Sequence, residues 1–544
     1  MKSNIKITET CELFKEYRNL CGMNLSVEGA GEKHFGYLQN MFVNYEKGGV
    51  LESFPGFRAI RRSGRRIHSA SIQSVAGEKF FIIHEGGGLY RLPYPDGNAE
   101  MIGEIGDCES KILSFGALVF ILCENRLYQL CKESLTLLCR CDFISGYSSL
   151  ALFDGRIFIS GSKEHSGKIF YSERLWENPS FSEDRCIESL GEINALLSHS
   201  GKLWVFKSEG ACADAICSYK SGNEYSLCDS ISGVKPIGQA LSVDNEIFLL
   251  SPEGLWSIST AEEETKLTKR SEAIEPLLIK EDLSSATLTC WRSYVAIGVE
   301  NHIYLLDRRG GGWYLLADIG SHIDDRRVFR YSPEAEEGYL AHKHTHEKAE
   351  SEVISLASED DKILYYTEEM DNKYSVYPTS EREGGELCSI RSLFSEGNLL
   401  CFKTSTDLLI FNSDMEDSTP GKYSFEGHAA KYLIVTEADN CGLPMTEKTS
   451  VGESLNLKIR AEKKTVIGVS ILKDGCTASC QRIVIPKSEN GAIFIKNQRN
   501  VRVAERIQGW ISKQIVIEST AFDSPIALSS ISFKYLPTQK IKKG

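Results

Sequence analysis

Long apolar segments and clear amphipathic helices are both scarce in this sequence of 544 residues. No run approaches the roughly 18 apolar residues that a membrane-spanning helix needs, so we expect none. The opening MKSNIKITETCELFKEY also lacks the apolar core of about 7–15 residues that marks a secretory signal. We therefore expect a protein that folds in the cytoplasm.

Positive charge is in short supply, because 62 Lys and Arg face 75 Asp and Glu, which leaves a formal net charge of −13. An acidic chain repels phosphate backbones, so general nucleic-acid binding is not expected. The 17 cysteines are odd in number and scattered through predicted strands. Secreted disulfide frameworks are small and pair their cysteines evenly, so we predict free thiols, with Cys123 and Cys401 as buried examples.

Signatures of catalysis and of metal binding are missing or incomplete. The chain contains neither GxSxG nor HExxH, so we do not expect an enzyme. Three sets of side chains have ligand-like spacing: His342, His344 and His346; Cys139 and Cys141; and Cys476 and Cys480. Charged residues follow the histidines at once, and neither cysteine pair has a second pair nearby. We therefore predict no metal and no cofactor.

What the chain does contain is a repeated phrase, in which an apolar strand, a polar turn and a second strand with Tyr or Trp follow one another. The first strand of successive phrases is centred on Phe80, Val119, Ile157, Leu203, Ile247 and Val295, with steps of 39, 38, 46, 44 and 48 residues. Hairpins at intervals of about 40–50 residues are typical of the four-stranded blades of a β-propeller. A further blade is expected at Gly338–Tyr366, which makes about seven. A continuous β-sandwich array is the alternative.

The all-β chain is expected to have four parts. Residues 1–45 lack the repeat and are interpreted as an N-terminal arm. Residues 46–414 form the propeller, and residues 415–450 form an irregular linker. Residues 451–544 contain six short alternating strands and are predicted to form a C-terminal β-sandwich.

Two stretches near the N-terminus are candidates for contacts between subunits. The arm carries apolar side chains such as Leu13, Phe14 and Tyr17, with no hairpin of its own to bury them. An arginine cluster follows FPGF and consists of Arg58, Arg61, Arg62, Arg65 and Arg66. We expect Leu13, Phe14, Tyr17, Arg58, Arg61 and Arg62 to contact a neighbouring subunit; for the arginines a solvated connector or a phosphate contact are the alternatives.

The dipeptide Pro55-Gly56 is expected to turn the chain sharply from the arm into the first blade. Proline fixes φ and glycine permits a positive φ. Phe54 and Phe57 flank the turn and are expected to fix it to the propeller. A valine at Gly56 would be strained if the φ of that residue is positive.

Three stretches resemble virion proteins of tailed bacteriophages. Gln39–Ile60 (QNMFVNYEKGGVLESFPGFRAI) looks like the opening of a family whose propellers build the tail or neck. Gly155–Phe181 is similar to one of its blade phrases, although Ser162-Lys163 replaces the usual Asn-Pro. Phe425–Ser450, with CGLPMTEKTS, resembles the linker to the C-terminal β domain of prophage relatives. The order of the parts also resembles the tail-hub protein of short-tailed phages.

The resemblance implies a non-enzymatic structural protein, assembled in the host cytoplasm and located in the virion tail or neck. Its implied partners are further copies of itself in a cyclic homo-oligomer, other tail, neck or portal proteins, and packaged DNA in passive contact. A host scaffold propeller of the WD or kelch type is one competitor. A glycan-binding or glycan-cleaving propeller at the tail tip is the main alternative, because Trp176, Trp256 and Trp313 are expected to be exposed.

Overall fold

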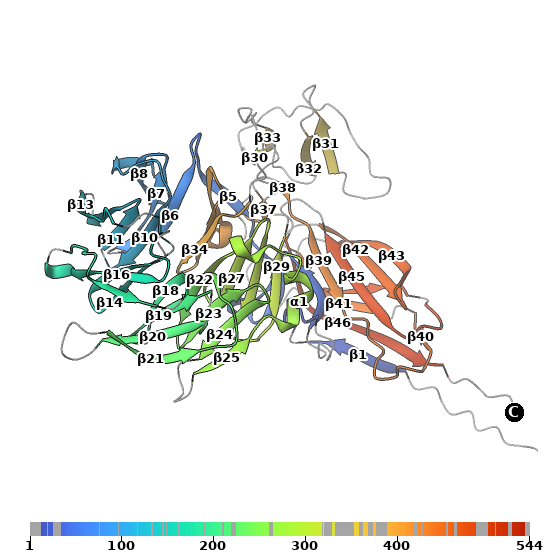
Figure 1. Cartoon of the computed structure of the whole chain (residues 1–544). Coiled ribbons are helices and arrows are strands. Elements are labelled where there is room, and N and C mark those ends of the chain that lie inside the picture. Colours follow the sequence, from blue (N-terminus) through green and yellow to red (C-terminus); the bar gives the residue numbers. More distant parts are fainter. Residues whose placement is uncertain are drawn as a thin grey trace, which may run out of the picture. The chain divides into compact units, whose positions relative to one another are not determined.

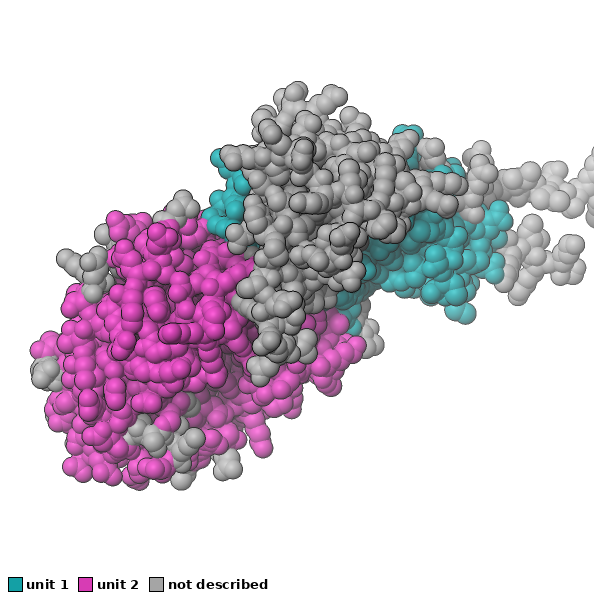
Figure 2. Space-filling model, turned by 90° about the horizontal axis from the view of Figure 1, so that it is seen from above, with its two compact units in different colours: residues 1–58, 304–386, 412–544 teal, residues 59–303, 387–411 magenta. Residues whose placement is uncertain are grey.

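The fold was analysed in a computed structural model (Figure 1). The structure describes residues 12–18, 20–25, 34–319 and 389–538 with short gaps, together with strands at 329–331, 353–357, 363–367 and 374–376. The candidate ligands His342, His344 and His346 lie outside the described residues. The chain divides into two compact units, coloured separately in Figure 2. Unit 1 comprises residues 1–58, 304–386 and 412–544, and unit 2 comprises residues 59–303 and 387–411.

Unit 2 is a β-propeller, and its blades are antiparallel sheets of consecutive strands. The first blade contains β6 (Ile67–Val75), β7 (Glu78–Glu85), β8 (Gly88–Tyr94) and β9 (Glu100–Glu104). The second contains β10 (Ser110–Phe115), β11 (Leu118–Cys123), β12 (Arg126–Cys131) and β13 (Ser134–Arg140). The third contains β14 (Ser149–Phe153), β15 (Arg156–Ser160), β16 (Lys168–Arg174) and β17 (Cys186–Glu188).

Three further blades follow in the same order along the chain. The fourth contains β18 (Ile193–His199), β19 (Lys202–Lys207), β20 (Ala213–Ser218) and β21 (Tyr225–Ile231). The fifth contains β22 (Ile237–Val243), β23 (Glu246–Ser251), β24 (Gly254–Ser259) and β25 (Lys266–Lys269), and the short helix α1 (Glu275–Leu278) follows it. The sixth contains β26 (Thr287–Trp291), β27 (Tyr294–Val299) and β28 (His302–Asp307), within which the division between the units falls.

The first strand of each blade is the innermost, and each of these strands contacts the next around the ring from β6 to β26. A closing sheet joins β34 (Ser392–Glu396), β35 (Leu399–Lys403) and β36 (Asp407–Phe411) to β5 (Phe57–Arg62). Its strand β34 contacts both β26 and β6, which completes the ring. The structure therefore has six blades of consecutive strands, and the expected number of about seven was wrong. Among the described residues in and next to Gly338–Tyr366, β31 (Val353–Ala357) pairs with β32 (Ile363–Thr367) in a separate two-stranded sheet.

The core of the propeller lies between adjacent blades. Aliphatic and aromatic side chains of β7 and β8 pack against those of β11 and β12, and the same arrangement recurs between the next blades. The six positions that mark the repeat, Phe80, Val119, Ile157, Leu203, Ile247 and Val295, are all buried, as predicted. They lie in the second strand of their blades, although the repeat in the sequence places them in the first strand of each phrase. The first strand of a blade is harder to recognise because it carries more polar side chains, as in SKILSF of β10.

Unit 1 contains two larger sheets assembled from distant parts of the chain. One sheet orders β3 (Met41–Asn44), β4 (Val50–Ser53), β46 (Ile526–Pro537), β41 (Leu455–Ala461) and β44 (Arg499–Val503), with β1 (Leu13–Tyr17) and β40 (Lys448–Ser450) also on β46. The other orders β29 (Trp313–Leu316), β2 (Phe35–Gln39), β39 (Tyr432–Thr436), β45 (Lys513–Ser519), β42 (Thr465–Lys473) and β43 (Cys476–Ile485). Burial alternates along β42 and β45, so each has one buried face.

The N-terminal segment is not a free arm with nothing to bury against. β1 pairs in antiparallel register with β46, where Leu13 faces Tyr535 and Tyr17 faces Ile531. The strands of residues 35–53 likewise belong to the sheets that contain the C-terminal strands. The C-terminal β-sandwich of residues 451–544 stays a prediction; the two sheets that hold its strands also hold strands from the N-terminal 53 residues.

The turn in FPGF closes a tight contact within unit 1. The amide of Gly56 donates to the carbonyl of Lys422 at 2.8 Å, and the amide of Asn412 donates to the Gly56 carbonyl at 2.8 Å. A Cβ atom on Gly56 would lie 1.9 Å from the carbonyl oxygen of Ser424, although its φ is not positive. Glycine is therefore required by close backbone approach and not by a left-handed conformation. Phe54 and Phe57 are buried beside it, and their rings contact Phe42 and Phe425 of unit 1, so their expected attachment to the propeller stays a prediction.

Two pairs of cysteines form disulfides, which corrects the prediction of free thiols. Cys108 pairs with Cys123, and Cys217 in β20 pairs with Cys228 in β21. Cys401 is a buried free thiol, as predicted. The sequence misled because neither pair is marked by close spacing or by a secretory context. In the described part of the chain no helix is long and apolar enough to cross a membrane.

Candidate functional site at one end of the inner strands

Polar and charged side chains gather where neighbouring inner strands of unit 2 begin. We call this set the inner-strand cluster and define it as Arg66, His68, His84, Asp107, Glu109, Ser110, Lys111, Arg391 and Lys403. Inner strands of a propeller run side by side around one axis, so their first residues meet at one end of it. The hydroxyls of Ser69 on β6 and Ser110 on β10 lie 2.5 Å apart, which ties these two beginnings together.

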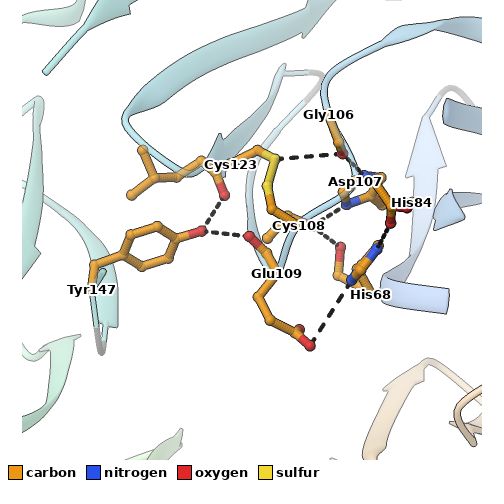
Figure 3. The surroundings of a disulfide bond; sticks show 11 residues. His68, His84, Gly106, Asp107, Cys108, Glu109, Cys123 and Tyr147 are labelled. Carbon is orange, nitrogen blue, oxygen red and sulfur yellow. Dashed lines mark hydrogen bonds and ion pairs between the residues drawn. A yellow bond between two sulfur atoms is a disulfide. The ribbon is translucent and has the colours of Figure 1, made fainter. Parts of the chain in front are cut away.

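His84 is a completely buried member of the cluster (Figure 3). Its Nε2 lies 2.8 Å from the carbonyl oxygen of Gly106, so this nitrogen carries the proton and donates. Its Nδ1 then accepts from the hydroxyl of Ser110 at 2.8 Å. Burial lowers the pKa of His84, which keeps the ring neutral. A histidine beside a serine is also the arrangement of a nucleophile and its base, but His84 has no surface exposed to a substrate.

His68 lies beside His84, with ring centroids 4.8 Å apart, and its ring is close to two acidic side chains (Figure 3). Its Nε2 is 2.7 Å from the carboxylate of Asp107, and its Nδ1 is 3.9 Å from that of Glu109. Cys108, between these two acids in the sequence, is held by its disulfide to Cys123 at the end of β11 (Figure 3). The disulfide therefore fixes the segment that presents both carboxylates.

The predicted contact residues of the arm lie in unit 1. Phe14 is 59% exposed and Leu13 is 36% exposed, so both remain available for contact with another molecule. Tyr17 is buried, and its hydroxyl donates to Asp439 at 2.7 Å. Burial raises the pKa of Tyr17, as does the neighbouring carboxylate. Tyr17 therefore stabilises the chain's own fold, and only the first two residues of the set point outward.

The arginine cluster is largely neutralised by acidic neighbours. Arg58 donates to Asn412 at 2.6 Å and lies 3.7 Å from Asp414. Arg61 forms an ion pair with Glu85, and its guanidinium is 4.9 Å from the ring centroid of Tyr90. Arg66 forms an ion pair with Glu109, and Arg62 is exposed at the end of β5. A subunit contact through these arginines stays a prediction, and their pairing makes a phosphate contact less favourable.

The described residues do not assemble a metal site: no group of three His, Cys, Asp or Glu side chains lies close enough to hold an ion. Cys139, Cys141, Cys476 and Cys480 are free thiols. Of the three tryptophans expected to be exposed, Trp313 is fully buried, Trp256 is partly buried, and Trp176 is 67% exposed. The expectation for Trp313 was wrong because this residue lies in β29, inside a sheet of unit 1.

Sequence reasoning missed most of the inner-strand cluster. His68, Asp107, Glu109 and Lys403 are far apart in sequence and meet only because the ring closes. A local signal did exist, since RRIHS and DCESK each place charged residues directly before a strand of the repeat. This signal becomes informative only once the strand is recognised as the innermost of a blade.

No protein family matches the sequence, and no curated protein does. Solved structures with similar arrangements include BamB from Moraxella catarrhalis, with TM-score 0.36, 11% identity, and coverage of 65% of this chain and 96% of that chain. The Neurospora crassa Pan2 WD40 domain gives TM-score 0.35, 8% identity, and coverage of 49% and 85%. YCF48 bound to D1 peptide gives TM-score 0.37, 10% identity, and coverage of 66% and 96%. Likeness at this level carries no argument about function.

Proposed function

We propose that the chain is a non-enzymatic structural component of a phage tail or neck, which assembles as a ring of identical subunits and contacts neighbouring virion proteins. The motifs that carry the resemblance support this proposal. Gly56 of ESFPGFR closes a contact that admits no side chain, and Arg58 of the same motif binds Asn412. The motif thus fixes the start of β5 to the segment after β36.

The observation that carries the proposal is the exposed apolar edge of β1. In the described part of the chain β1 pairs with β46 and with no other strand, so no described strand lies along its other edge. Leu13 and Phe14 add apolar side chains to that edge. Unprotected edges of this kind accept a strand from another chain. We infer that the edge of β1 contacts the neighbouring subunit.

The test compares Phe14→Asp with Phe115→Asp in the full-length chain. Phe115 is 56% exposed but belongs to β10 of unit 2, so it is a matched control. We expect the unchanged chain to form rings by mass photometry and negative-stain imaging, and Phe14→Asp to yield monomers with an unaltered melting temperature. Phe115→Asp should still form rings. Normal rings from Phe14→Asp would overturn the contact, and absence of the chain from purified particles by mass spectrometry would overturn the virion role.

A second candidate function is glycan recognition at a tail tip. It is favoured by Trp176, which is 67% exposed and lies 5.4 Å from the guanidinium of Arg174. An exposed indole provides a flat apolar face on which a sugar ring can stack. A glycan array would test this, because binding that is lost in Trp176→Ala would favour the second candidate.

A further inference from the structure

Four cationic side chains of the inner-strand cluster lie at the same end of adjacent strands. The amide of Ile67, next to Arg66, donates to the carbonyl of Ser405 at 2.7 Å, which joins the start of β6 to the closing sheet. The amide of Arg391 donates to the carbonyl of Lys403 at 2.8 Å. The Lys403 ammonium in turn donates to the carbonyl of Ile67 at 3.0 Å. Arg66, Arg391 and Lys403 are thus brought together by main-chain contacts.

Lys111 completes the group from the neighbouring blade. It follows Ser110, whose hydroxyl contacts Ser69 on β6. Solvent reaches the Lys111 side chain, yet desolvation by the surrounding protein lowers its pKa.

The pKa of Lys403 reflects the positive charges that surround it. It is only 8% exposed, and burial lowers its pKa to about 8. The charges of Arg66, Arg391 and Lys111 lower it further, while Glu109 opposes them. Arg66, Arg391 and Lys111 are therefore each near enough to repel the ammonium of Lys403.

The acidic side chains at this end do not balance these cations. Asp107 is held by His68, and Glu109 is shared between Arg66 and His68. Lys111 and Arg391 form no ion pair within the described part of the chain. Four cations against two carboxylates leave two positive charges, which matches a dianion.

We propose that this end of the inner strands binds a doubly charged oxyanion of the sulfate or phosphate class between Lys111, Arg391 and Lys403. Lys111 belongs to the second blade, Lys403 belongs to the closing sheet and Arg391 directly precedes β34 of that sheet, so side chains from two sheets of the ring would converge on the ion. Such charge-assisted hydrogen bonds are stronger than neutral ones, and the surrounding protein reduces competition from water. This site is independent of the proposed role in a tail or neck.

The experiment titrates sulfate into the full-length chain by calorimetry, with sodium chloride at equal ionic strength as the reference. Lys111→Gln should weaken sulfate binding about tenfold, because it removes one direct charge at an accessible position. Lys266→Gln is the matched control, since Lys266 is exposed on the outer strand β25, and it should bind as the unchanged chain does. Equal affinity of the two variants would overturn the proposal, as would the absence of sulfate binding by the unchanged chain.

A second variant and a pH series test the buried member. Lys403→Met should also weaken binding at least about tenfold. Sulfate keeps its double charge between pH 7 and 9, so its binding by the unchanged chain should weaken over this range as Lys403 loses its proton. Sulfate binding that does not change with pH would contradict the role of Lys403. A DNA duplex serves as the polymeric source of phosphate; binding of the duplex that depends on Lys111, without binding of sulfate, would replace the small oxyanion by a phosphodiester backbone.

Discussion

The two units use the chain in opposite ways. Every blade of unit 2 is made from consecutive strands joined by short turns. The central strand of unit 1, β46, instead pairs with β1 and β4 from the first 53 residues and with β40 and β41 from residues 448–461. A unit of local hairpins can form piece by piece, whereas unit 1 needs the two ends of the chain to meet.

The units also differ in how they bury a lysine. Lys513 of unit 1 is 2% exposed and forms an ion pair with Glu505, which is itself 1% exposed and accepts a hydrogen bond from Ser450. Lys403 of unit 2 donates to a main-chain carbonyl instead. Burial lowers the pKa of both lysines. Unit 1 therefore compensates the buried charge of Lys513 with Glu505. In unit 2 the buried charge of Lys403 remains for an external anion to compensate.

The largest effect is expected when the ion pair of unit 1 is broken. Glu505→Gln would leave Lys513 buried without an opposite charge, which costs about 3–5 kcal/mol of unfolding free energy. Guanidinium denaturation would measure the loss. Glu416→Gln changes an exposed carboxylate of the same unit and should alter stability by less than about 0.5 kcal/mol. Similar values for both variants would show that the pair does not support unit 1.

A somewhat smaller loss is expected from Gly56→Val, because its Cβ would lie 1.9 Å from the Ser424 carbonyl oxygen. The backbone must move, at a cost of about 3 kcal/mol. Gly64→Val is the control, since no atom lies within 4 Å of its Cβ position. The melting temperatures of the two variants would test this. Equal melting temperatures would mean that the contact at FPGF accommodates a valine without loss of stability.

These differences explain which features the sequence could predict. Residues such as Ile157 and Ile247 were recognised as buried because each lies in a hairpin whose pattern is local. Tyr17 was assigned to a subunit contact because its partner, Asp439, lies 422 residues away, where no local pattern can report it. Lys403 was missed for the same reason, since its neighbours Ile67 and Lys111 come from other sheets.

The buried lysine of unit 2 gives a pH dependence of opposite sign to that of a stabilising ion pair. An unfolded lysine has a pKa of about 10.4, and that of folded Lys403 is about 8, so the unfolded state binds more protons between these values. Stability should therefore rise with pH, by about 2–3 kcal/mol from pH 7 to 10 through this group. Denaturation at both pH values would show the rise, and Lys403→Met should remove that share. An equal rise in the variant would assign it to other lysines.

The smallest effect on stability is expected from a change in the N-terminal strand β1. Tyr17→Phe removes a hydrogen bond to Asp439, whose pKa is lowered by bonds from Tyr17, the Cys441 amide and Lys15 despite its burial. Because two donors remain, the cost should be only about 1 kcal/mol. Tyr225→Phe is the matched change in unit 2, where the buried Tyr225 hydroxyl has no hydrogen-bond partner among the described residues, so it should cost nothing. If both changes cost nothing, the Tyr17–Asp439 hydrogen bond adds nothing to the pairing of β1 with β46.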